Sequence, residues 1–380
     1  MPLLTKGRLL VSDVTQRCYR ITSQRFARGG FGEVYRAVEL DDHRDPCGEV
    51  AIKVSLHALT WHGEAYFGRL LAGQQNVVQV LDAFPLVDGK GSARQVKYVL
   101  VLEWMAEGTV DDLLSEPNRA WSEDEVLQQG AALLRVLARL HRRGICHGDI
   151  TPRNVFVQDG CLVLGDLGIA KQSLNEGPVE LDGATPEVFA PPDAFPFYWS
   201  SSEDVYQVGL LVLGLLAGEV VTSDRVSGRL LKRVIASDST KGWIRDALSK
   251  EDVRFEDATE ALGALLSEPV RPARSPRSLR GQRVVFTGKL PIVRAEAQAQ
   301  ARAAGAIVQN RVNGVTSVVV AGQPNPLQIG QKYGTKLFDA HRRLRRGQRI
   351  AIIDAARFAG LLERSHAQAA GRPDRRSRRH

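Results

Sequence analysis

The sequence predicts two folded modules, a larger α+β module followed by a small α/β module, on three observations. The chain has 380 residues, and at about 100–200 residues per domain this length indicates two or three domains. A segment rich in proline and arginine interrupts the chain at 268–279. After it, predicted strands and helices follow in the order β-α-β-β-α-β-α, which is typical of a small, mostly parallel sheet flanked by helices.

The charge of the chain changes at the same place. Of 51 Lys+Arg and 43 Asp+Glu in total, residues 268–380 hold 23 and 6, which leaves 28 and 37 for residues 1–267. Such asymmetry indicates modules with different partners. We therefore expect a first module at 1–267, an extended linker at 268–279, a second module at 280–364 and a basic, disordered tail at 365–380.

Composition excludes several classes of protein. Hydrophobic residues make up 43% of the chain, enough for packed cores and unlike a disordered or collagen-like chain. The four cysteines are too few for a disulfide scaffold and too widely spaced for a zinc knuckle, so we expect reduced thiols and a cytoplasmic location. The start of the chain lacks the apolar stretch of a signal peptide, and the apolar run at 208–218 is shorter than the ~20 residues that a bilayer requires. We therefore expect no membrane partner.

A glycine-rich turn lies between two β-prone segments near the N-terminus. Gly29, Gly30 and Gly32 would let backbone N–H groups approach phosphate oxygens, although such turns also occur in ordinary hairpins. The next predicted strand, 49–54, carries Lys53 among valine and isoleucine residues. A lysine in this setting is more often an edge or solvent residue, but its position after the glycine-rich turn favours a phosphate ligand.

Two acids and an amide follow further along the chain. Asp149 and Asn154 lie five residues apart in a predicted loop, and Asp166 follows a short strand. One carboxylate can accept a proton from a nucleophile, whereas an amide and a second carboxylate can hold Mg²⁺ on nucleotide phosphates. Glu64 is the first acid after Lys53 and the candidate to pair with it; the alternative is an exposed carboxylate at a helix start.

In this order, these features resemble the protein kinase domain over roughly residues 15–267. That family combines a glycine loop, a strand lysine, a His-Arg-Asp loop ending in asparagine, and Asp-Phe-Gly. The corresponding segments here are Ala27–Val34, Ala51–Lys53, His147–Asn154 and Asp166–Gly168. Residues 98–105 resemble the hinge strand of the family, and residues 183–192 resemble the end of its activation segment. The resemblance implies a two-lobed α+β fold.

The resemblance also implies a role for each residue, with ATP and Mg²⁺ as cofactors. Lys53, oriented by Glu64, would contact the phosphates. Asn154 and Asp166 would hold the metal, and Asp149 would accept the hydroxyl proton. The residues implied to bind the nucleotide are Ala27, Gly29, Gly30, Gly32, Val34, Ala51, Lys53, Glu103, Met105, Asn154 and Asp166.

Several positions depart from the kinase pattern. Gly148 replaces the arginine that pairs with a phosphorylated activation loop, so we expect no switching by loop phosphorylation. Thr151 stands where serine/threonine kinases usually have a lysine, and Arg153 is the candidate to supply its charge during catalysis. Pro192 replaces the glutamate of Ala-Pro-Glu. None of these changes removes a residue that touches nucleotide or metal.

The second module resembles the BRCT domain, particularly the single copy that ends bacterial NAD-dependent DNA ligases. Its predicted elements are strands at 282–288, 306–309, 315–321 and 350–353 and helices at 294–304, 335–346 and 355–363. BRCT domains that bind phosphate use a hydroxyl, the next glycine N–H and a lysine, which fall here on Thr287, Gly288 and Lys336. The alternative is ordinary turn chemistry at Thr287 and a solvated lysine.

Five arginines, Arg342, Arg343, Arg345, Arg346 and Arg349, form a basic cluster in the second module. Without interleaved aromatic residues, such a cluster favours contact with nucleic-acid backbone phosphates over base stacking. An alternative is contact with the acidic first module. A helix C-terminus also favours cations by itself.

Together these features predict a serine/threonine protein kinase that acts on protein substrates. The BRCT-like module and the basic tail would bring it to DNA, to DNA-processing proteins or to phosphoproteins. One alternative is a nucleotide-binding pseudokinase scaffold with a DNA- or phosphopeptide-binding BRCT domain. Another is a small-molecule phosphotransferase, because His-Gly-Asp also occurs in antibiotic kinases, although the activation-segment match at 183–192 argues against it.

Overall fold

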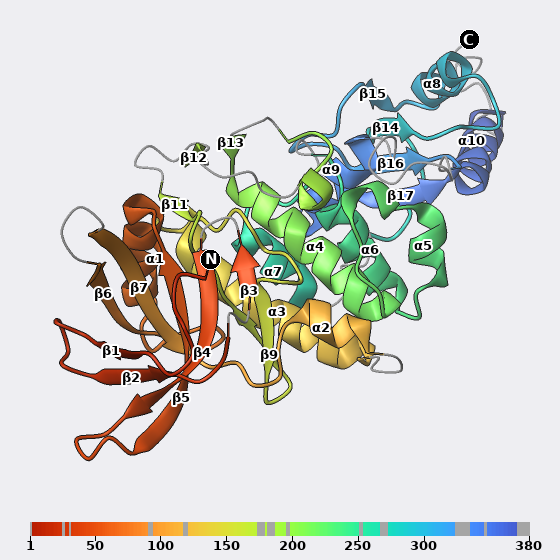
Figure 1. Cartoon of the computed structure of the whole chain (residues 1–380). Coiled ribbons are helices and arrows are strands. Elements are labelled where there is room, and N and C mark those ends of the chain that lie inside the picture. The colour runs from red at the N-terminus through yellow and green to blue at the C-terminus, as the bar shows by residue number, and fades with distance from the viewer. Residues whose placement is uncertain are drawn as a thin grey trace, which may run out of the picture. The chain divides into compact units, whose positions relative to one another are not determined.

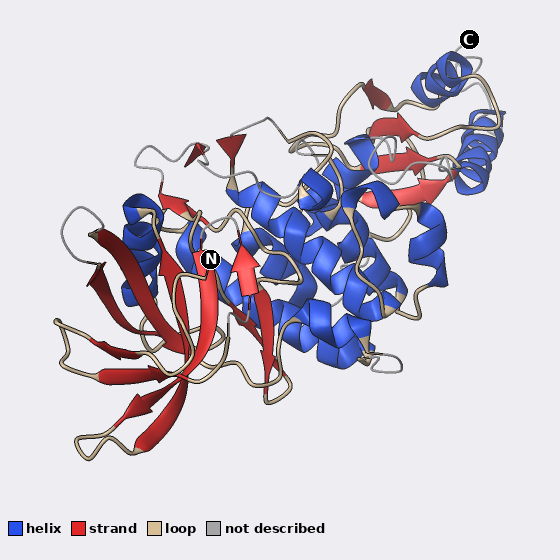
Figure 2. Ribbon diagram, in the orientation of Figure 1, coloured by secondary structure: helices blue, strands red, loops and turns tan. Residues whose placement is uncertain are grey.

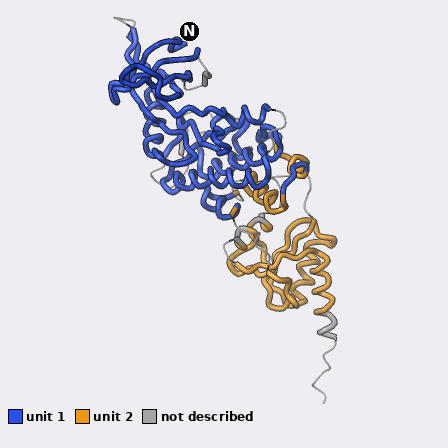
Figure 3. Tube along the Cα trace, turned by 90° about the horizontal axis from the view of Figure 1, so that it is seen from below, with its two compact units in different colours: residues 1–225, 233–236, 255–265 blue, residues 226–232, 237–254, 266–380 orange. Residues whose placement is uncertain are grey.

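The structure is a computed structural model of the whole chain. The residues that it describes are 2–24, 27–29, 32–89, 94–116, 121–172, 179–180, 187–194, 198–250, 254–266, 273–323, 335–345 and 348–370. They form two compact units, which Figure 3 shows in different colours. The first unit contains residues 1–225, 233–236 and 255–265, and the second contains residues 226–232, 237–254 and 266–380. Among the described residues, no helix is long and apolar enough to cross a membrane.

The first lobe of the first unit is an antiparallel sheet. Its strands are β1 (Leu9–Val11), β2 (Cys18–Ile21), β3 (Ala27–Gly29), β4 (Gly32–Leu40), β5 (Pro46–Ser55), β6 (Val80–Asp88) and β7 (Gln95–Glu103). Their order is β1-β2-β4-β5-β7-β6, and β3 pairs with β4. Figure 2 shows these strands gathered apart from the helices of the second lobe.

The two faces of this sheet have different environments because side chains alternate along each strand. On β5, Val50, Ile52 and Val54 are buried in one apolar cluster, which the N-terminal residue Leu4 also enters. The other face packs against helix α1 (Ala58–Leu70) through a second cluster of apolar residues. This alternation places Lys53 on the α1 side of the sheet.

The second lobe is built on buried helices. Its principal helices are α2 (Val110–Ser115), α3 (Glu123–His141), α4 (Ser201–Ala217) and α7 (Ala258–Leu266). Capping boxes start α3 at Ser122 and α4 at Ser200, where each serine hydroxyl and a glutamate three residues later satisfy backbone N–H groups. Most side chains of α4 are buried, so α4 forms the centre of this lobe.

Short strands and 3₁₀ turns connect these helices. They are β8 (Ile145–Cys146), β9 (Val155–Gln158), β10 (Cys161–Leu164), β11 (Lys171–Gln172), β12 (Val179–Glu180), β13 (Tyr198–Trp199), η2 (Glu187–Phe189) and η3 (Ser223–Arg225). The β9–β10 hairpin lies in the chain between the predicted catalytic loop, which precedes β9, and Asp166, which follows β10. Residues 183–186 of the activation-segment match lie outside the described residues.

The second unit contains the predicted small α/β module. Its strands are β14 (Arg283–Thr287), β15 (Ile307–Gln309), β16 (Val318–Ala321) and β17 (Ala351–Asp354), and its helices are α8 (Arg294–Ala303), α9 (Thr335–Arg345) and α10 (Ala355–Ala370). The strands form one parallel sheet in the order β15-β14-β16-β17 (Figure 1). This confirms the predicted four-stranded parallel sheet flanked by helices. The unit also includes helix α6 (Asp238–Ala247) and most of α5 (Gly228–Arg233).

Apolar clusters cover both faces of this parallel sheet, as such sheets require. On β14, Val284 and Phe286 enter a cluster with residues of α8 and α10, whereas Val285 enters a second cluster with residues of α9. The Phe358 ring of α10 lies 5.2 Å from that of Phe286 in a T-shaped pair. A phenylalanine therefore serves the core here.

Two boundaries differ from the prediction. Residues 273–279 were expected to belong to an extended linker, yet Leu279 is fully buried in the core of the second unit and the Ala273 N–H donates to the Ile350 carbonyl. Residues 365–370 were expected in the disordered tail, but they continue helix α10 to Ala370. Alanine and glutamine favour this extension, since both are good helix formers. Residues 267–272 and 371–380 lie outside the described part of the chain.

Candidate active site

An ion-pair cluster joins the two lobes of the first unit. Lys53 lies on β5 and its Nζ is 2.8 Å from Glu64 Oε2 and 2.8 Å from Asp166 Oδ1. Glu64 comes from the middle of α1, and Asp166 follows β10 in the other lobe. The predicted pairing of Lys53 with Glu64 is present, and the lysine is a buried residue rather than an edge residue.

Burial and charge act in opposite directions on this cluster. Burial favours the neutral form of Lys53, but the charges of Asp166 and Glu64 outweigh it and raise the lysine pKa above its usual value. Burial raises the pKa of Glu64 to about 7, against the opposing effect of Lys53. Burial also acts to raise the pKa of Asp166, yet Lys53 holds it below its ordinary value. The cluster therefore keeps a charged lysine and a charged Asp166 at neutral pH.

The predicted catalytic segment forms a compact loop before β9. The Asn154 Nδ2 donates to Asp149 Oδ2 at 2.7 Å and to the Asp149 carbonyl at 3.0 Å. The Asp149 N–H donates to His147 Nδ1 at 3.2 Å, and His147 Nε2 donates to the Gly165 carbonyl at 3.0 Å. Burial lowers the pKa of His147, so this ring is neutral and links the loop to the residue before Asp166.

Asp149 has one carboxylate oxygen without a partner. Its Oδ1 is one of two buried side-chain oxygen or nitrogen atoms in the described part of the chain that form no hydrogen bond. Burial and the nearby charge of Asp166 raise the pKa of Asp149 to about 7. A buried carboxylate with a free oxygen and a pKa near neutrality suits a general base.

Asp166 and Asn154 retain the oxygens that a hard metal ion prefers. The Asp166 Oδ1 accepts from Lys53 and from the Gly168 N–H at 3.1 Å, whereas its Oδ2 accepts no hydrogen bond from a described residue. The Asn154 Oδ1 likewise accepts none within the described ranges, because the amide uses its Nδ2 to hold Asp149. Two oxygen ligands of this type fit Mg²⁺, with water and substrate phosphates completing its coordination.

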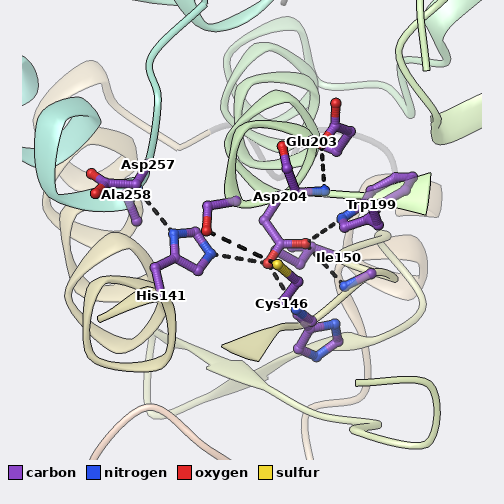
Figure 4. Close-up of polar contacts among 12 residues, drawn as sticks. His141, Cys146, Ile150, Trp199, Glu203, Asp204, Asp257 and Ala258 are labelled. Carbon is purple, nitrogen blue, oxygen red and sulfur yellow. Dashed lines mark hydrogen bonds and ion pairs between the residues drawn. The ribbon is translucent and has the colours of Figure 1, made fainter. Parts of the chain in front are cut away.

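A buried aspartate, Asp204, holds the start of the catalytic loop, and Figure 4 shows it between His141 and Trp199. Asp204 Oδ2 lies 3.0 Å from His141 Nε2 and accepts the His147 N–H at 2.8 Å. Its Oδ1 accepts the Gly148 N–H at 2.9 Å and the Trp199 Nε1–H at 2.7 Å. Burial would raise the pKa of Asp204, but hydrogen bonding and the charge of His141 hold it below its usual value.

Asp204, in the first turn of α4, was not among the predicted site residues. Gly148 is bound to it with a φ of +83°, a left-handed conformation that glycine adopts without strain. The glycine that departs from the kinase pattern thus has a backbone conformation that suits it. The buried Ser202-Glu-Asp204 start of α4 was the available signal for this support.

The predicted nucleotide residues share one face of the sheet. Val34 pairs with Lys53 across β4 and β5, and Ala51 lies two residues before the lysine, so all three point to the same side. Gly29 pairs with Gly32, and a Cβ at Gly32 would lie only 2.4 Å from the Val54 carbonyl oxygen. Close backbone approach therefore requires glycine at that position.

The hinge residues lie at the end of the neighbouring strand. Glu103 ends β7, where its N–H donates to the Gln79 carbonyl, and Met105 is buried in an apolar cluster two residues later. Gly30 lies outside the described residues, and only the backbone of Ala27 and Gly29 is described. The structure thus brings Val34, Ala51 and Lys53 to one side of the sheet, whereas Glu103 pairs with Val50, whose side chain lies on the other face.

Arg153 has surroundings that the prediction did not include. Its side chain is 80% exposed, and its Nε lies 3.3 Å from Asp111 Oδ2 on α2. The nearby Thr151 is buried and bonds through its backbone to Asp149 and Asn154. An exposed ion pair of this type contributes little stability, so the arginine can leave it at low cost.

The second unit brings the predicted phosphate residues together at the end of β14. Thr287 is buried and ends the strand, Gly288 follows with a φ of +72°, and Lys336 Nζ lies 3.4 Å from the Phe286 carbonyl. Arg294 was not predicted; its guanidinium donates to the carbonyls of Phe286 at 2.7 Å and Gly288 at 2.6 Å. In the sequence, the only indication of this role was that Arg294 begins the helix that follows Thr287 and Gly288.

In the described residues, the side chains of Lys336 and Arg294 contact backbone carbonyl oxygens. In the described residues, neither Lys336 nor Arg294 forms an ion pair with a carboxylate. Burial, followed by repulsion from Arg294, lowers the pKa of Lys336. Of the basic cluster, Arg343 and Arg349 have described side chains, whereas Arg342 and Arg345 are described by backbone alone and Arg346 lies outside the described residues.

Comparison with known proteins places the first unit in context. The family model of the protein kinase domain matches residues 21–274. A probable serine/threonine-protein kinase of Clostridium acetobutylicum is 25% identical over 281 residues, which cover 67% of this chain and 40% of the relative. The serine/threonine-protein kinases Pkn1 and pkn3 of Myxococcus xanthus are 29% and 28% identical, covering 53% and 67% of this chain. The chain spans 29% and 47% of the length of those two relatives.

Proposed function

Because the chain belongs to the protein kinase family, we propose that it transfers the γ-phosphoryl group of ATP to serine or threonine hydroxyls of proteins. One observation carries the proposal: Lys53, Asp166, Asn154 and Asp149 converge while three oxygens of this set remain free of described hydrogen bonds. Of these oxygens, Asp149 Oδ1 is buried, and because buried polar atoms are normally paired, its lack of a partner argues against a purely structural role. The serine/threonine preference rests on the relatives' names.

Each residue then has a task that its surroundings allow. Lys53 binds the phosphates of ATP while Glu64 fixes its position, and Asp149 Oδ1 accepts the proton of the attacking hydroxyl. Asn154 Oδ1 and Asp166 Oδ2 would hold Mg²⁺, which neutralises phosphate charge when bound. Because little covalent chemistry is required of the protein, positioning and charge supply most of the rate.

A transfer assay with radiolabelled ATP tests this function. The full chain should label itself or a basic protein substrate, and acid hydrolysis should yield phosphoserine or phosphothreonine. Asp166→Ala should abolish labelling, whereas Asp42→Ala, which alters an exposed carboxylate, should retain it. Nucleotide binding by the wild-type chain without transfer would instead support a pseudokinase scaffold.

For the second unit, we propose that residues 280–364 form a BRCT domain that binds a phosphate group of a partner. The parallel sheet, the two apolar clusters and the convergence of Thr287, Gly288, Arg294 and Lys336 support this proposal. A hydroxyl and two cations without carboxylate partners suit a dianion. We also propose the kinase domain at 1–267, with residues 273–279 packed on the BRCT domain.

Two sources of that phosphate are a 5′-phosphorylated DNA end and a phosphoprotein. Binding of the full chain to duplex DNA with and without a 5′-phosphate, and to peptides with and without phosphoserine, separates them. DNA binding through the arginine cluster should weaken steeply with salt. We further propose a cytoplasmic location, because the four cysteines form no disulfide.

A further inference from the structure

An open hollow of about 580 Å³ lies where helices α1 and α3 end. Its lining has two parts, one that follows Glu64 on α1 and one that precedes the catalytic loop. The lining residues are Leu70, Leu71, Ala72, Gly73, Gln74, Arg139, Arg142 and Arg143. No part of the ion-pair cluster or of the catalytic loop belongs to it.

The lining is strongly cationic. It contains three arginines and no carboxylate, although residues 1–267 hold more acids than bases. Arg139 lies in the last turn of α3, and Arg142 and Arg143 directly follow the helix, so the three arginines come from one short segment at its end. In the described part of the chain none of the three forms an ion pair, and Arg142 alone donates from its side chain, to the Ala138 carbonyl at 3.2 Å.

A helix C-terminus attracts cations, but this does not explain the whole arrangement. The attraction is confined to the last turn and would be met by one or two exposed side chains. The three arginines are exposed, so solvent screens their mutual repulsion, but three guanidinium groups around one hollow still attract an anion between them. A phosphate dianion offers the acceptor geometry that arginine matches best.

We propose that this hollow binds a phosphate dianion, either free or carried on a phosphorylated side chain. The volume accommodates a phosphate with an attached group, and the open form admits a peptide. The site is separate from the nucleotide residues, which lie on β4, β5 and the end of β7. It is also separate from the phosphate residues of the second unit.

Both parts of the lining connect to the active site. On the α1 side, residues just beyond the hollow bond to β10: the Val78 N–H donates to the Leu164 carbonyl and the Asn76 side chain to the Leu162 carbonyl. Asp166 follows two residues after Leu164. On the α3 side, His141 ends the helix and bonds to Asp204, which holds the catalytic loop.

An anion held by the hollow would therefore fix the ends of the two helices that position Glu64 and the catalytic loop. This consequence rests on the proposed kinase function, whereas the binding site itself does not. We expect bound phosphate to raise the transfer rate several-fold by stabilising the Lys53–Glu64 pair.

Binding can be measured apart from catalysis. The full chain carrying Lys336→Gln, with its nucleotide site saturated by a non-hydrolysable ATP analogue and Mg²⁺, is titrated calorimetrically with inorganic phosphate and with a short phosphoserine peptide. Arg139→Gln/Arg143→Gln should weaken binding at least tenfold. The matched pair Arg69→Gln/Arg135→Gln removes two exposed arginines of the same helices and should change affinity less than twofold.

The outcomes are distinct. Tighter binding of the peptide assigns the site to phosphoproteins, and equal binding of both probes assigns it to free phosphate. Equal affinities in the two arginine pairs, or no binding at millimolar concentration, overturn the site. Binding that depends on Arg139 and Arg143 but leaves the rate unchanged overturns the coupling alone. A chain that binds phosphate yet transfers none would refute the kinase proposal and leave the site standing.

Discussion

Two regions of this molecule hold a lysine that we propose as a phosphate ligand, and the surroundings of the two lysines differ. In the first unit, Lys53 lies between Glu64 and Asp166, each with an oxygen 2.8 Å away. In the second unit, Lys336 lies beside Arg294, and its Nζ is 3.4 Å from the Phe286 carbonyl oxygen. The pKa of the first lysine is raised by its partners, whereas that of the second is lowered by burial and by its neighbour.

Under the two functions that we propose, this difference distinguishes a catalytic site from a site that only binds a ligand. A lysine already paired by its own chain is fixed in position, and its charge is present before the substrate arrives, as preorganised catalysis requires. Cations without carboxylate partners gain most when an outside anion arrives, as a binding pocket requires. The predictions that follow test this contrast.

The largest effect should come from removing the base. Asp149→Asn keeps the size of the side chain but cannot accept the hydroxyl proton, so kcat should fall about 10²–10⁴-fold. Steady-state kinetics measure the loss, and circular dichroism should show an unchanged fold. Asp13→Asn, at an exposed position, should keep the wild-type rate. A mutant with nearly full activity would contradict the role of Asp149.

The second effect concerns the support below the catalytic loop. Asp204→Ala leaves buried donors from His141, His147, Gly148 and Trp199 without an acceptor. Breaking such a buried charged network should lower the free energy of unfolding by about 3–5 kcal/mol. Urea unfolding measures this loss.

Asp224→Ala is the matched control, because the Asp224 carboxylate is exposed and accepts no hydrogen bond from a buried donor in the described residues. This substitution should change the free energy of unfolding by less than about 0.5 kcal/mol. A similar small change for Asp204→Ala would show that the loop holds its shape without the aspartate. The active site of the first unit would then be held in place by the Lys53–Glu64–Asp166 cluster alone.

Local patterns were sufficient to predict much of this molecule. The strand lysine and the Asp149–Asn154 spacing are short-range features, and the structure pairs Lys53 with Glu64 and Asn154 with Asp149. The parallel sheet of the second unit also followed from the order of apolar runs. Such predictions succeed because strand and helix periodicity reflect burial directly.

Other features depend on contacts between distant segments and left weaker signals. The bond between Lys53 and Asp166 joins residues 113 apart, and only the fold brings them together. Arg294 and Asp204 looked like ordinary helix-start residues. Leu279 lies in a segment whose prolines and arginines indicated a linker, yet one apolar residue anchors it in the core. The average composition of a segment does not reveal a single buried residue of this kind.

The third effect concerns ligand binding by Lys336 and Arg294, which form no ion pair with a carboxylate of the described residues. Lys336→Gln and Arg294→Gln should each weaken binding of a phosphorylated ligand about tenfold, because each removes a charged donor from the same anion. Arg302→Gln on the exposed side of α8 is the control and should change affinity less than twofold. Fluorescence anisotropy with the phosphorylated DNA and peptide probes measures this. Equal losses at all three positions would indicate diffuse attraction instead of a pocket.

The smallest effect is a change of rate with pH. The pKa of Asp149 is raised to about 7, and the base must be ionised to accept a proton. The rate should therefore be constant above pH ~7 and fall about tenfold per pH unit below it. A carboxylate with an ordinary pKa would keep its activity down to pH ~4.

Glu64 also has a pKa of about 7, so its protonation has to be separated from that of Asp149. Glu64→Gln cannot titrate at this position, and it should lower the rate by weakening the hold on Lys53. If Asp149 is the titrating base, the acid limb of this variant keeps its midpoint near pH 7. A limb that disappears in Glu64→Gln would assign the pH dependence to the lysine cluster, and the contrast between the two regions would then rest on the protonation of Glu64.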